Sequence, residues 1–152
     1  MRVAVGGTFS VVHRGHLALL EMAFCIADEV LVGITSDRMA SGKGYSAPPL
    51  IERRAALEEA IAAIASGKPY HIREIDDEVG PAGAERLDAI VVSEESEAGA
   101  RLVNDAREGN GLNALMVVIV PMVKGSDGKV ISSRHIIDGK MDREGKLLSK
   151  SA

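Results

Sequence analysis

The fold of this chain is decided by the loop sequence Gly6-Gly7-Thr8-Phe9-Ser10-Val11-Val12-His13-Arg14-Gly15-His16, which joins an apolar run to a helical pattern. The preceding Val3-Ala4-Val5 is typical of a buried parallel strand. Apolar residues recur at helical spacing from Leu17 to Ala27. The quoted stretch is therefore predicted to be a strand-to-helix loop. We expect free backbone N–H groups at the start of the helix, which would bind a phosphate.

The side chains of this loop suit an anionic ligand. Gly6 and Gly7 let the backbone approach a ligand without interference from a Cβ atom. Thr8 supplies a hydroxyl, and His13 and His16 supply ring nitrogens. The loop therefore places several polar groups within one turn.

Length and composition predict one soluble domain that spans residues 1–152. The chain is 46% hydrophobic and 26% charged, and only 3% of its residues are aromatic, so Val, Ile, Leu and Ala must fill the core. A net charge of −4 argues against a nucleic-acid partner. The single cysteine, Cys25, is predicted to be a buried thiol on the apolar face of the first helix.

No membrane partner is expected. The sequence has no apolar run of the length that crosses a bilayer. Its first residues lead directly into a strand, without the apolar region of a signal peptide. We therefore expect a cytoplasmic location.

Apolar runs and helical patterns alternate along the rest of the chain. Further strands are predicted at 29–35, 69–75, 88–93 and 115–120, and further helices at 50–65 and 97–108. In the helix over 50–65, Leu57, Ile61 and Ile64 share the apolar face, and Arg53 is expected elsewhere. The polar segment 36–49 is predicted to be a mobile loop. A last helical region starts after Ile131, with a charged remainder that is helical or frayed.

This alternation predicts an α/β fold with a five-stranded parallel sheet flanked by helices. The loops after the first, second, fourth and fifth strands should converge at the carboxyl edge of the sheet, where ligands bind. The two commonest phosphate loops are absent. The first loop departs from G-x-G-x-x-G at its third position, and Gly42-Lys43 is followed by Gly44 where a Walker loop needs Ser or Thr.

The remaining pattern, G-G-T-F-x-x-x-H-x-G-H, resembles the nucleotidyltransferase superfamily with the T/HxGH signature. Its second signature also appears, as Ile131-Ser132-Ser133. Val91–Ser96, Gly111–Asn113 and Asp142-Arg143-Glu144-Gly145 are similar to the archaeal and eukaryotic type of phosphopantetheine adenylyltransferase. The resemblance covers nearly the whole chain and implies a Rossmann-like nucleotidyltransferase fold.

The resemblance implies transfer of the adenylyl group of ATP to 4′-phosphopantetheine. A phosphate oxygen of the acceptor would attack the α-phosphorus in line, so the protein needs to position and stabilise rather than supply a nucleophile. Mg²⁺ is expected to be held mainly by ATP phosphates and water, with no metal ligands from the protein. A monomer is favoured.

The resemblance also implies roles for individual residues. Catalysis is expected to depend on His16, Lys43 and Thr8. The acceptor is expected to contact Thr8, Lys43 and Arg53, although Arg53 and Arg54 are alternatively surface residues that pair with Glu58. The residues expected to bind ATP lie in the two signatures and after the fourth strand: Gly6, Gly7, Thr8, Phe9, His13, His16, Glu94, Ser132, Ser133 and Arg134.

Other interpretations compete for these residues. His16 and one of the two serines could have a structural role as helix caps and no contact with the ligand. Thr8 could form a turn, and Lys43 and Glu94 could be solvent-exposed. A cytidylyltransferase, a flavin adenylyltransferase (FAD synthetase) or a nucleotide-binding sensor without turnover would carry a related site.

The chain departs from the family pattern at two positions. Ser10 stands where the family usually has Asp, so a hydroxyl must fix the loop or that role is lost. In the second signature Arg134 lies one turn before the usual arginine, and Ile137 occupies the usual position. Residues three apart share a helix face, so we expect Arg134 to supply the phosphate contact.

Overall fold

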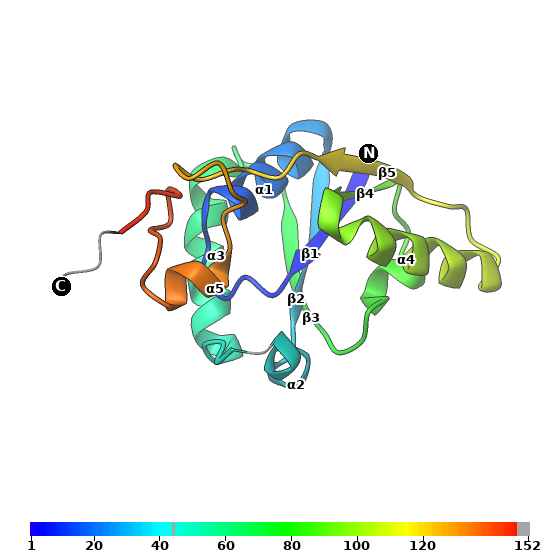
Figure 1. The fold of residues 1–152 in the computed structure, drawn as a ribbon. Helices are drawn as coiled ribbons and strands as arrows, with labels where there is room; N and C mark the ends of the chain where they lie inside the picture. Colours follow the sequence, from blue (N-terminus) through cyan, green and yellow to red (C-terminus); the bar gives the residue numbers. More distant parts are fainter. Residues whose placement is uncertain (44, 149–152) are drawn as a thin grey trace.

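A five-stranded parallel sheet forms the centre of the molecule (Figure 1). The computed structural model describes residues 1–43 and 45–148, with Lys43 and His135 described in backbone only. The strands are β1 (Arg2–Gly7), β2 (Glu29–Thr35), β3 (Tyr70–Ile75), β4 (Ala89–Ser93) and β5 (Met116–Val120), in the order β3-β2-β1-β4-β5. From β1 the chain adds β2 and β3 on one side of the sheet and then crosses over to add β4 and β5 on the other side. The topological switch point therefore lies between β1 and β4.

Helices cover both faces of the sheet. Helices α1 (Arg14–Ile26) and α3 (Leu50–Ile64) lie on one face, and α4 (Glu97–Gly109) lies on the other (Figure 1). The short elements are α2 (Asp37–Ala40), η1 (Ser41–Lys43), η2 (Gly80–Gly83), η3 (Glu94–Ser96) and α5 (Ser133–Ile137). The predicted α/β class and parallel sheet are therefore confirmed.

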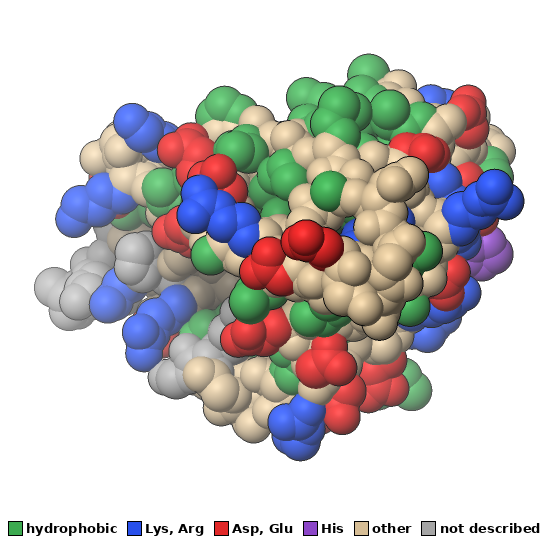
Figure 2. Space-filling model, turned by 90° about the vertical axis from the view of Figure 1, so that its right-hand side faces the viewer, with side chains coloured by type: hydrophobic (Ala, Val, Ile, Leu, Met, Phe, Trp, Pro, Cys, Tyr) green, Lys and Arg blue, Asp and Glu red, His purple; other side chains and the backbone are tan. Residues whose placement is uncertain are grey.

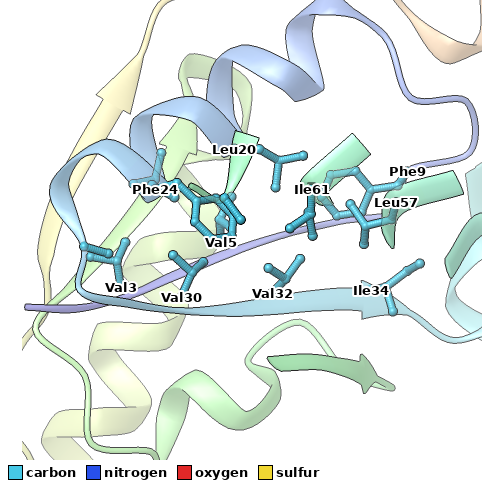
Figure 3. Packing of buried hydrophobic residues seen from close by; sticks show 14 of the residues in the cluster. Val3, Val5, Phe9, Leu20, Phe24, Val30, Val32, Ile34, Leu57 and Ile61 are labelled. Carbon is cyan, nitrogen blue, oxygen red and sulfur yellow. The ribbon is translucent and has the colours of Figure 1, made fainter. Parts of the chain in front are cut away.

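The period-two alternation of the strands divides the core into two layers. On the α1 and α3 face, Val3 and Val5 of β1 lie beside Val30 and Val32 of β2 and pack under the helices (Figure 3). On the α4 face, a smaller cluster packs against Ala100 and Val103. Aliphatic residues supply most of this core, as the low aromatic content predicts.

The strand β5 forms one edge of the sheet. The sequence of this strand is more apolar than that of any other strand. Even so, Met116 and Ile119 are exposed, with 50% and 43% of their surface accessible to solvent. Apolar side chains gather along the top of the face shown in Figure 2, at the height of β5 in Figure 1, and acidic side chains spread over its centre and lower half. The apolar run in this strand therefore does not mark a fully buried strand.

Two segment predictions are wrong in part. The segment 36–49 is not an irregular loop throughout, because Ser36 caps α2 by accepting a hydrogen bond from Met39 N at 3.2 Å, and η1 follows. The residues after α5 are neither helical nor frayed as far as Leu148. They fold back on themselves with an antiparallel bridge between Met141 and Leu147, and Met141 is buried.

The prediction for Cys25 is also wrong, because this thiol is exposed. The buried side chains of α1 are Leu20, Ala23 and Phe24. One further residue rotates a helix by about 100°, which turns Cys25 away from the core. Among the described residues, no helix is long and apolar enough to span a membrane.

Candidate active site

A cavity of about 460 Å³ opens at the carboxyl edge of the sheet, a size typical of small-molecule sites. The loops after β1, β4 and β5 supply most of its walls, and Tyr45 comes from the loop after β2. The predicted convergence of four loops is confirmed. The polar or glycine residues that line the cavity are Gly6, Gly7, Thr8, Ser10, His13, Gly15, His16, Tyr45, Ser93, Glu95, Ser96, Ser132, Ser133 and Arg134.

The two histidines of the first signature form a stacked pair at the start of α1. Their ring centroids lie 3.9 Å apart. Nδ1 of His13 accepts a hydrogen bond from Gly15 N at 3.0 Å, and Nδ1 of His16 accepts one from His13 N at 3.2 Å, as in a capping box. Because each Nδ1 is an acceptor, the ring proton of each neutral imidazole resides on Nε2.

Both histidines are neutral at physiological pH. Burial lowers the pKa of His13 from 6.5 to about 4. Burial also lowers the pKa of His16, to about 3, and the neighbouring His13 adds to this shift, while a backbone hydrogen bond at Val11 opposes it. The pair therefore offers N–H donors to an anion without carrying formal charge.

These shifts predict a pH-dependent stability. Between pH 6.5 and about 4 the unfolded chain binds protons at these positions that the folded chain does not, so the free energy of unfolding should fall as the pH falls through this range. A His13→Asn variant keeps an N-cap acceptor but cannot titrate. Thermal melts between pH 6.5 and 5 should show a smaller loss of Tm for this variant than for the wild type, and equal losses would contradict the prediction.

The backbone N–H groups at the start of α1 are not free, contrary to the expectation from the sequence. Arg14 N donates to the Arg143 carbonyl at 3.1 Å. The His13 side chain accepts from the next backbone N–H groups. The helix start therefore presents imidazole groups to the cavity, and its own first donors are already used within the protein.

Thr8 lies at the end of a chain of buried hydrogen bonds. Nη1 of Arg53 donates to the carbonyls of Thr8 and Thr35, at 3.0 and 2.8 Å, and lies 3.4 Å from Thr35 Oγ1. The Thr35 hydroxyl in turn donates to Thr8 Oγ1 at 3.1 Å. The Thr8 hydroxyl is therefore left with its own proton to donate, and Thr8 lines the cavity.

Arg53 itself is buried, which the apolar pattern of α3 did not predict. Only 1% of its surface is exposed. Besides the two threonine carbonyls, its guanidinium donates to Pro48 O at 2.7 Å and to Asp37 Oδ1 at 3.1 Å. The surface ion pair with Glu58 belongs to Arg54 instead. Arg53 does not line the cavity, so it supports the cavity wall indirectly, through its hydrogen bonds to the carbonyls of Thr8 and Thr35.

Ser10 occupies the position at which the family usually has Asp. Its hydroxyl lies 2.9 Å from the hydroxyl of Tyr45, and Ser10 is buried. This bond ties the loop after β2 to the loop after β1. A hydroxyl pair therefore fixes the loop here, which is one of the two alternatives left open by the sequence.

The neighbouring Phe9 has a positive φ of 50°, a conformation that L residues rarely adopt and that costs about 1–3 kcal/mol. Its ring is buried in the core, 5.1 Å from the ring of His16. Core packing thus holds the loop in a strained turn at the cavity wall, and Phe9 itself lines the cavity.

The second signature forms the opposite wall. Ile131 is buried, and Ser132, Ser133 and Arg134 all line the cavity at the start of α5. Ser133 Oγ donates to Val11 O at 3.2 Å, which connects the two signatures directly. The structure therefore brings together segments that are more than 100 residues apart.

Among the predicted site residues whose side chains are described, Glu94 and Arg53 lie outside the cavity wall. Glu94 does not line the cavity, and its Oε1 accepts a hydrogen bond from Met122 N at 3.3 Å. Glu95, the next residue, lines the cavity instead. Lys43 lies in η1, and its side chain is outside the described residues, so its predicted role is not tested.

A second, narrower cavity of about 200 Å³ lies between the sheet and α4. Its walls are mainly apolar side chains and glycines, among them Gly33, Val91 and Gly99, with Glu78 and Ser96 as polar members. Gly6, Gly7 and Ser96 line both cavities. The two cavities therefore adjoin at the end of β1.

Sequence patterns did not point to Tyr45, Glu95 or the second cavity. Tyr45 is one of two tyrosines in the chain and lies in a Gly- and Ser-rich segment. An isolated aromatic residue in such a segment indicates a role in the site only weakly. The second cavity is lined by residues from the sheet, α4 and the segment 75–82, so it depends on tertiary packing.

Comparisons with known proteins agree with this geometry. The family model described as cytidylyltransferase-like matches residues 4–139. A phosphopantetheine adenylyltransferase of Methanothermobacter thermautotrophicus is 38% identical over 149 residues, which make up 97% of this chain and 90% of the relative. Its counterpart in Methanosarcina acetivorans is 42% identical over 153 residues, covering 99% of this chain and 97% of the relative.

A similar solved structure is that of a protein of unknown function from Archaeoglobus fulgidus, which is 30% identical. It matches with a TM-score of 0.72 over 79% of this chain and 89% of its own.

Proposed function

The chain belongs to the cytidylyltransferase-like family, and we infer that it transfers the adenylyl group of ATP to 4′-phosphopantetheine. The products are dephospho-coenzyme A and pyrophosphate, so the protein is a nucleotidyltransferase of coenzyme A biosynthesis. Archaeal relatives named for this activity match it over nearly their whole length.

The observation that carries this function is the junction of two unlike cavities at Gly6 and Gly7. The larger carries hydroxyls, an arginine and the histidine pair among its lining residues, which suits a triphosphate. The narrower is apolar with few polar groups, which suits the pantetheine arm. A substrate in each cavity would place the two reacting phosphates beside the end of β1.

The chemistry at this junction is a single displacement. An oxygen of the acceptor phosphate forms a bond to the α-phosphorus of ATP, and the bond from that phosphorus to the bridging oxygen breaks, which releases pyrophosphate. The side chains at the junction need only orient the phosphates and stabilise the charge that develops. The buried Nε2–H donors of His13 and His16 suit this role, since burial strengthens their electrostatic effect.

We assign the individual roles accordingly. His16 stabilises the α-phosphate in the transition state, and His13 binds ATP phosphates beside it. The Thr8 hydroxyl binds the acceptor phosphate, and Lys43 draws the two substrates together. Arg53 supports the acceptor site through the Thr8 and Thr35 carbonyls rather than by contact with the substrate.

Mg²⁺ is proposed to enter with ATP. Within residues 1–43 and 45–148, no group of three or more His, Cys, Asp or Glu residues could hold a metal ion. The cavity wall carries one carboxylate, Glu95, among several hydroxyls. These residues do not form a metal cage by themselves, so the ion's remaining ligands would be ATP phosphates and water.

One assay tests the function. The protein is incubated with Mg²⁺, ATP and 4′-phosphopantetheine, and release of pyrophosphate is measured. No release, combined with turnover of CTP and glycerol 3-phosphate or of ATP and FMN, would assign the chain to another branch of the family. Nucleotide binding without turnover of any pair would instead indicate a sensor.

An Arg134→Ala variant tests the unusual second signature. Arg134 lines the nucleotide cavity beside Ser133, and a charge-assisted bond to a phosphate contributes about 1.5–3 kcal/mol. Calorimetry should show ATP affinity lower by about tenfold or more. The exposed Arg101, which pairs with Glu97 on α4, provides the matched control Arg101→Ala. Unchanged affinity and rate in the Arg134 variant would contradict the proposed contact.

We further propose that the chain acts as one cytoplasmic domain and as a monomer. Sedimentation analysis of the purified protein, with and without both substrates, would test the oligomeric state.

A further inference from the structure

We propose that the turn Asp142–Lys146, which we call the Asp142 turn, positions the two walls of the nucleotide cavity relative to each other. The turn contains the sequence Asp-Arg-Glu-Gly, and none of the catalytic or binding roles proposed above involves these four residues. It also lies beyond residue 139, where the match to the family model ends. The inference rests on the proposed function for the identity of the nucleotide.

The turn contacts the first wall through its backbone. The carbonyl of Arg143 accepts the N–H of Arg14, the first residue of α1, at 3.1 Å. Arg14 follows His13 directly and lies two residues before His16. The position of this carbonyl therefore fixes the start of the helix that carries both imidazoles.

The same turn contacts the second wall. The Gly145 carbonyl accepts the N–H of Ser126 at 2.8 Å, and Ser126 Oγ accepts the N–H of Leu147 at 3.0 Å. Ser126 belongs to the hairpin that is closed by the bridge between Lys124 and Val130 and leads into the second signature. The C-terminal segment, red in Figure 1, thus lies on the α1 side of the sheet and joins both walls.

The shape of the turn is fixed by one carboxylate and one glycine. Oδ1 of Asp142 accepts the N–H groups of Glu144 and Lys146, at 3.0 and 2.8 Å. Gly145 has a φ of +84°, and a Cβ atom there would lie 2.6 Å from Ile131 Cδ1 and 2.8 Å from Gly125 Cα. Because Ile131 opens the second signature, any movement of Gly145 is transmitted to the cavity wall.

An Asp142→Ala variant removes the acceptor oxygen of both hydrogen bonds that shape the turn. We expect the Kd for ATP, measured by calorimetry, to rise about tenfold, since two hydrogen bonds that hold the turn are lost. The KM for 4′-phosphopantetheine should stay within about twofold, because the hydrogen bonds that the structure describes for the Asp142 turn reach Arg14 and Ser126 and none of the residues that line the second cavity alone. Asp142→Asn retains an acceptor oxygen and should restore ATP binding. Glu144→Ala, an exposed change in the same turn, should bind ATP as the wild type does.

A second variant keeps the inference testable if Asp142→Ala does not fold. Gly145→Ala pushes the turn away from Ile131 and should also weaken ATP binding. Gly67→Ala is its control, because Gly67 has a similar φ of +77° but open space around its Cβ position. Gly145→Ala with wild-type ATP affinity, or Asp142→Ala with equal losses for both substrates, would overturn the inference. Wild-type protein that binds ATP without turnover would contradict the proposed function, while the calorimetric comparison of ATP affinity between the variants would still test the turn.

Discussion

Replacement of His16 by Gln is expected to lower kcat for adenylyl transfer by about 10²–10³ or more, the effect of removing a donor that stabilises developing charge. Gln at this position can still accept the hydrogen bond from His13 N, as in a capping box, so the start of α1 should remain folded. The loss would then come from the missing imidazole. Steady-state release of pyrophosphate measures it.

Two controls separate chemistry from folding in this experiment. His71, on the edge strand β3, pairs with Glu29 at 3.1 Å, and His71→Ala should leave kcat unchanged. Thermal melts of His16→Gln should lie close to those of the wild type. If His16→Gln retained most of its turnover, the histidine would be a helix cap only, and another group would have to stabilise the α-phosphate.

The second large effect is expected on stability. Arg53→Ala should lower the free energy of unfolding by about 3–5 kcal/mol, because it leaves the backbone carbonyls of Thr8, Thr35 and Pro48 without their donor. Urea denaturation measures the change.

The adjacent Arg54 gives a matched comparison for this effect. Arg54 is half-exposed and pairs with Glu58 four residues later, so Arg54→Ala should cost about 0.5 kcal/mol or less. Arg53→Lys is informative as well, because one ammonium cannot replace the fork that reaches Thr8, Thr35 and Pro48 together. Equal effects of the Arg53 and Arg54 changes would show that burial of Arg53 contributes little.

Local patterns were sufficient to predict the parts of this molecule that depend on local chemistry. The order of strand, loop and helix around residues 6–16 follows from residues that are close in sequence, and β2 has the predicted bounds. The loop itself is shorter than predicted, because β1 continues through Gly7, where it pairs with β2, and α1 begins at Arg14. The edge of the sheet at which the cavity opens follows from the rule for parallel strands. His13 and His16 could be named because they match the T/HxGH signature of the family that the sequence resembles, and their spacing of three residues is consistent with the stacked pair in the structure.

The remaining features depend on contacts between distant residues. The helical pattern predicted Arg53 outside the apolar face, in contact with the acceptor or in a surface ion pair, but the residue is buried. The carbonyls that hold it come from three separate segments, which no local pattern reveals. The Ser10 and Tyr45 hydroxyls meet across 35 residues. The Asp142 turn carried a local signal, an Asp followed by a glycine three residues later, which is typical of a turn rather than a helix.

The exposed Cys25 has a practical consequence for work on this protein in solution. It is the only cysteine in the chain and lies near the end of α1 opposite the histidine pair. An accessible thiol in a chain with no internal partner can join two molecules under oxidising conditions. Covalent dimers in aerated buffer would therefore be an artefact of storage, and a maleimide dye would label the molecule at one site on the far end of the helix from its chemistry.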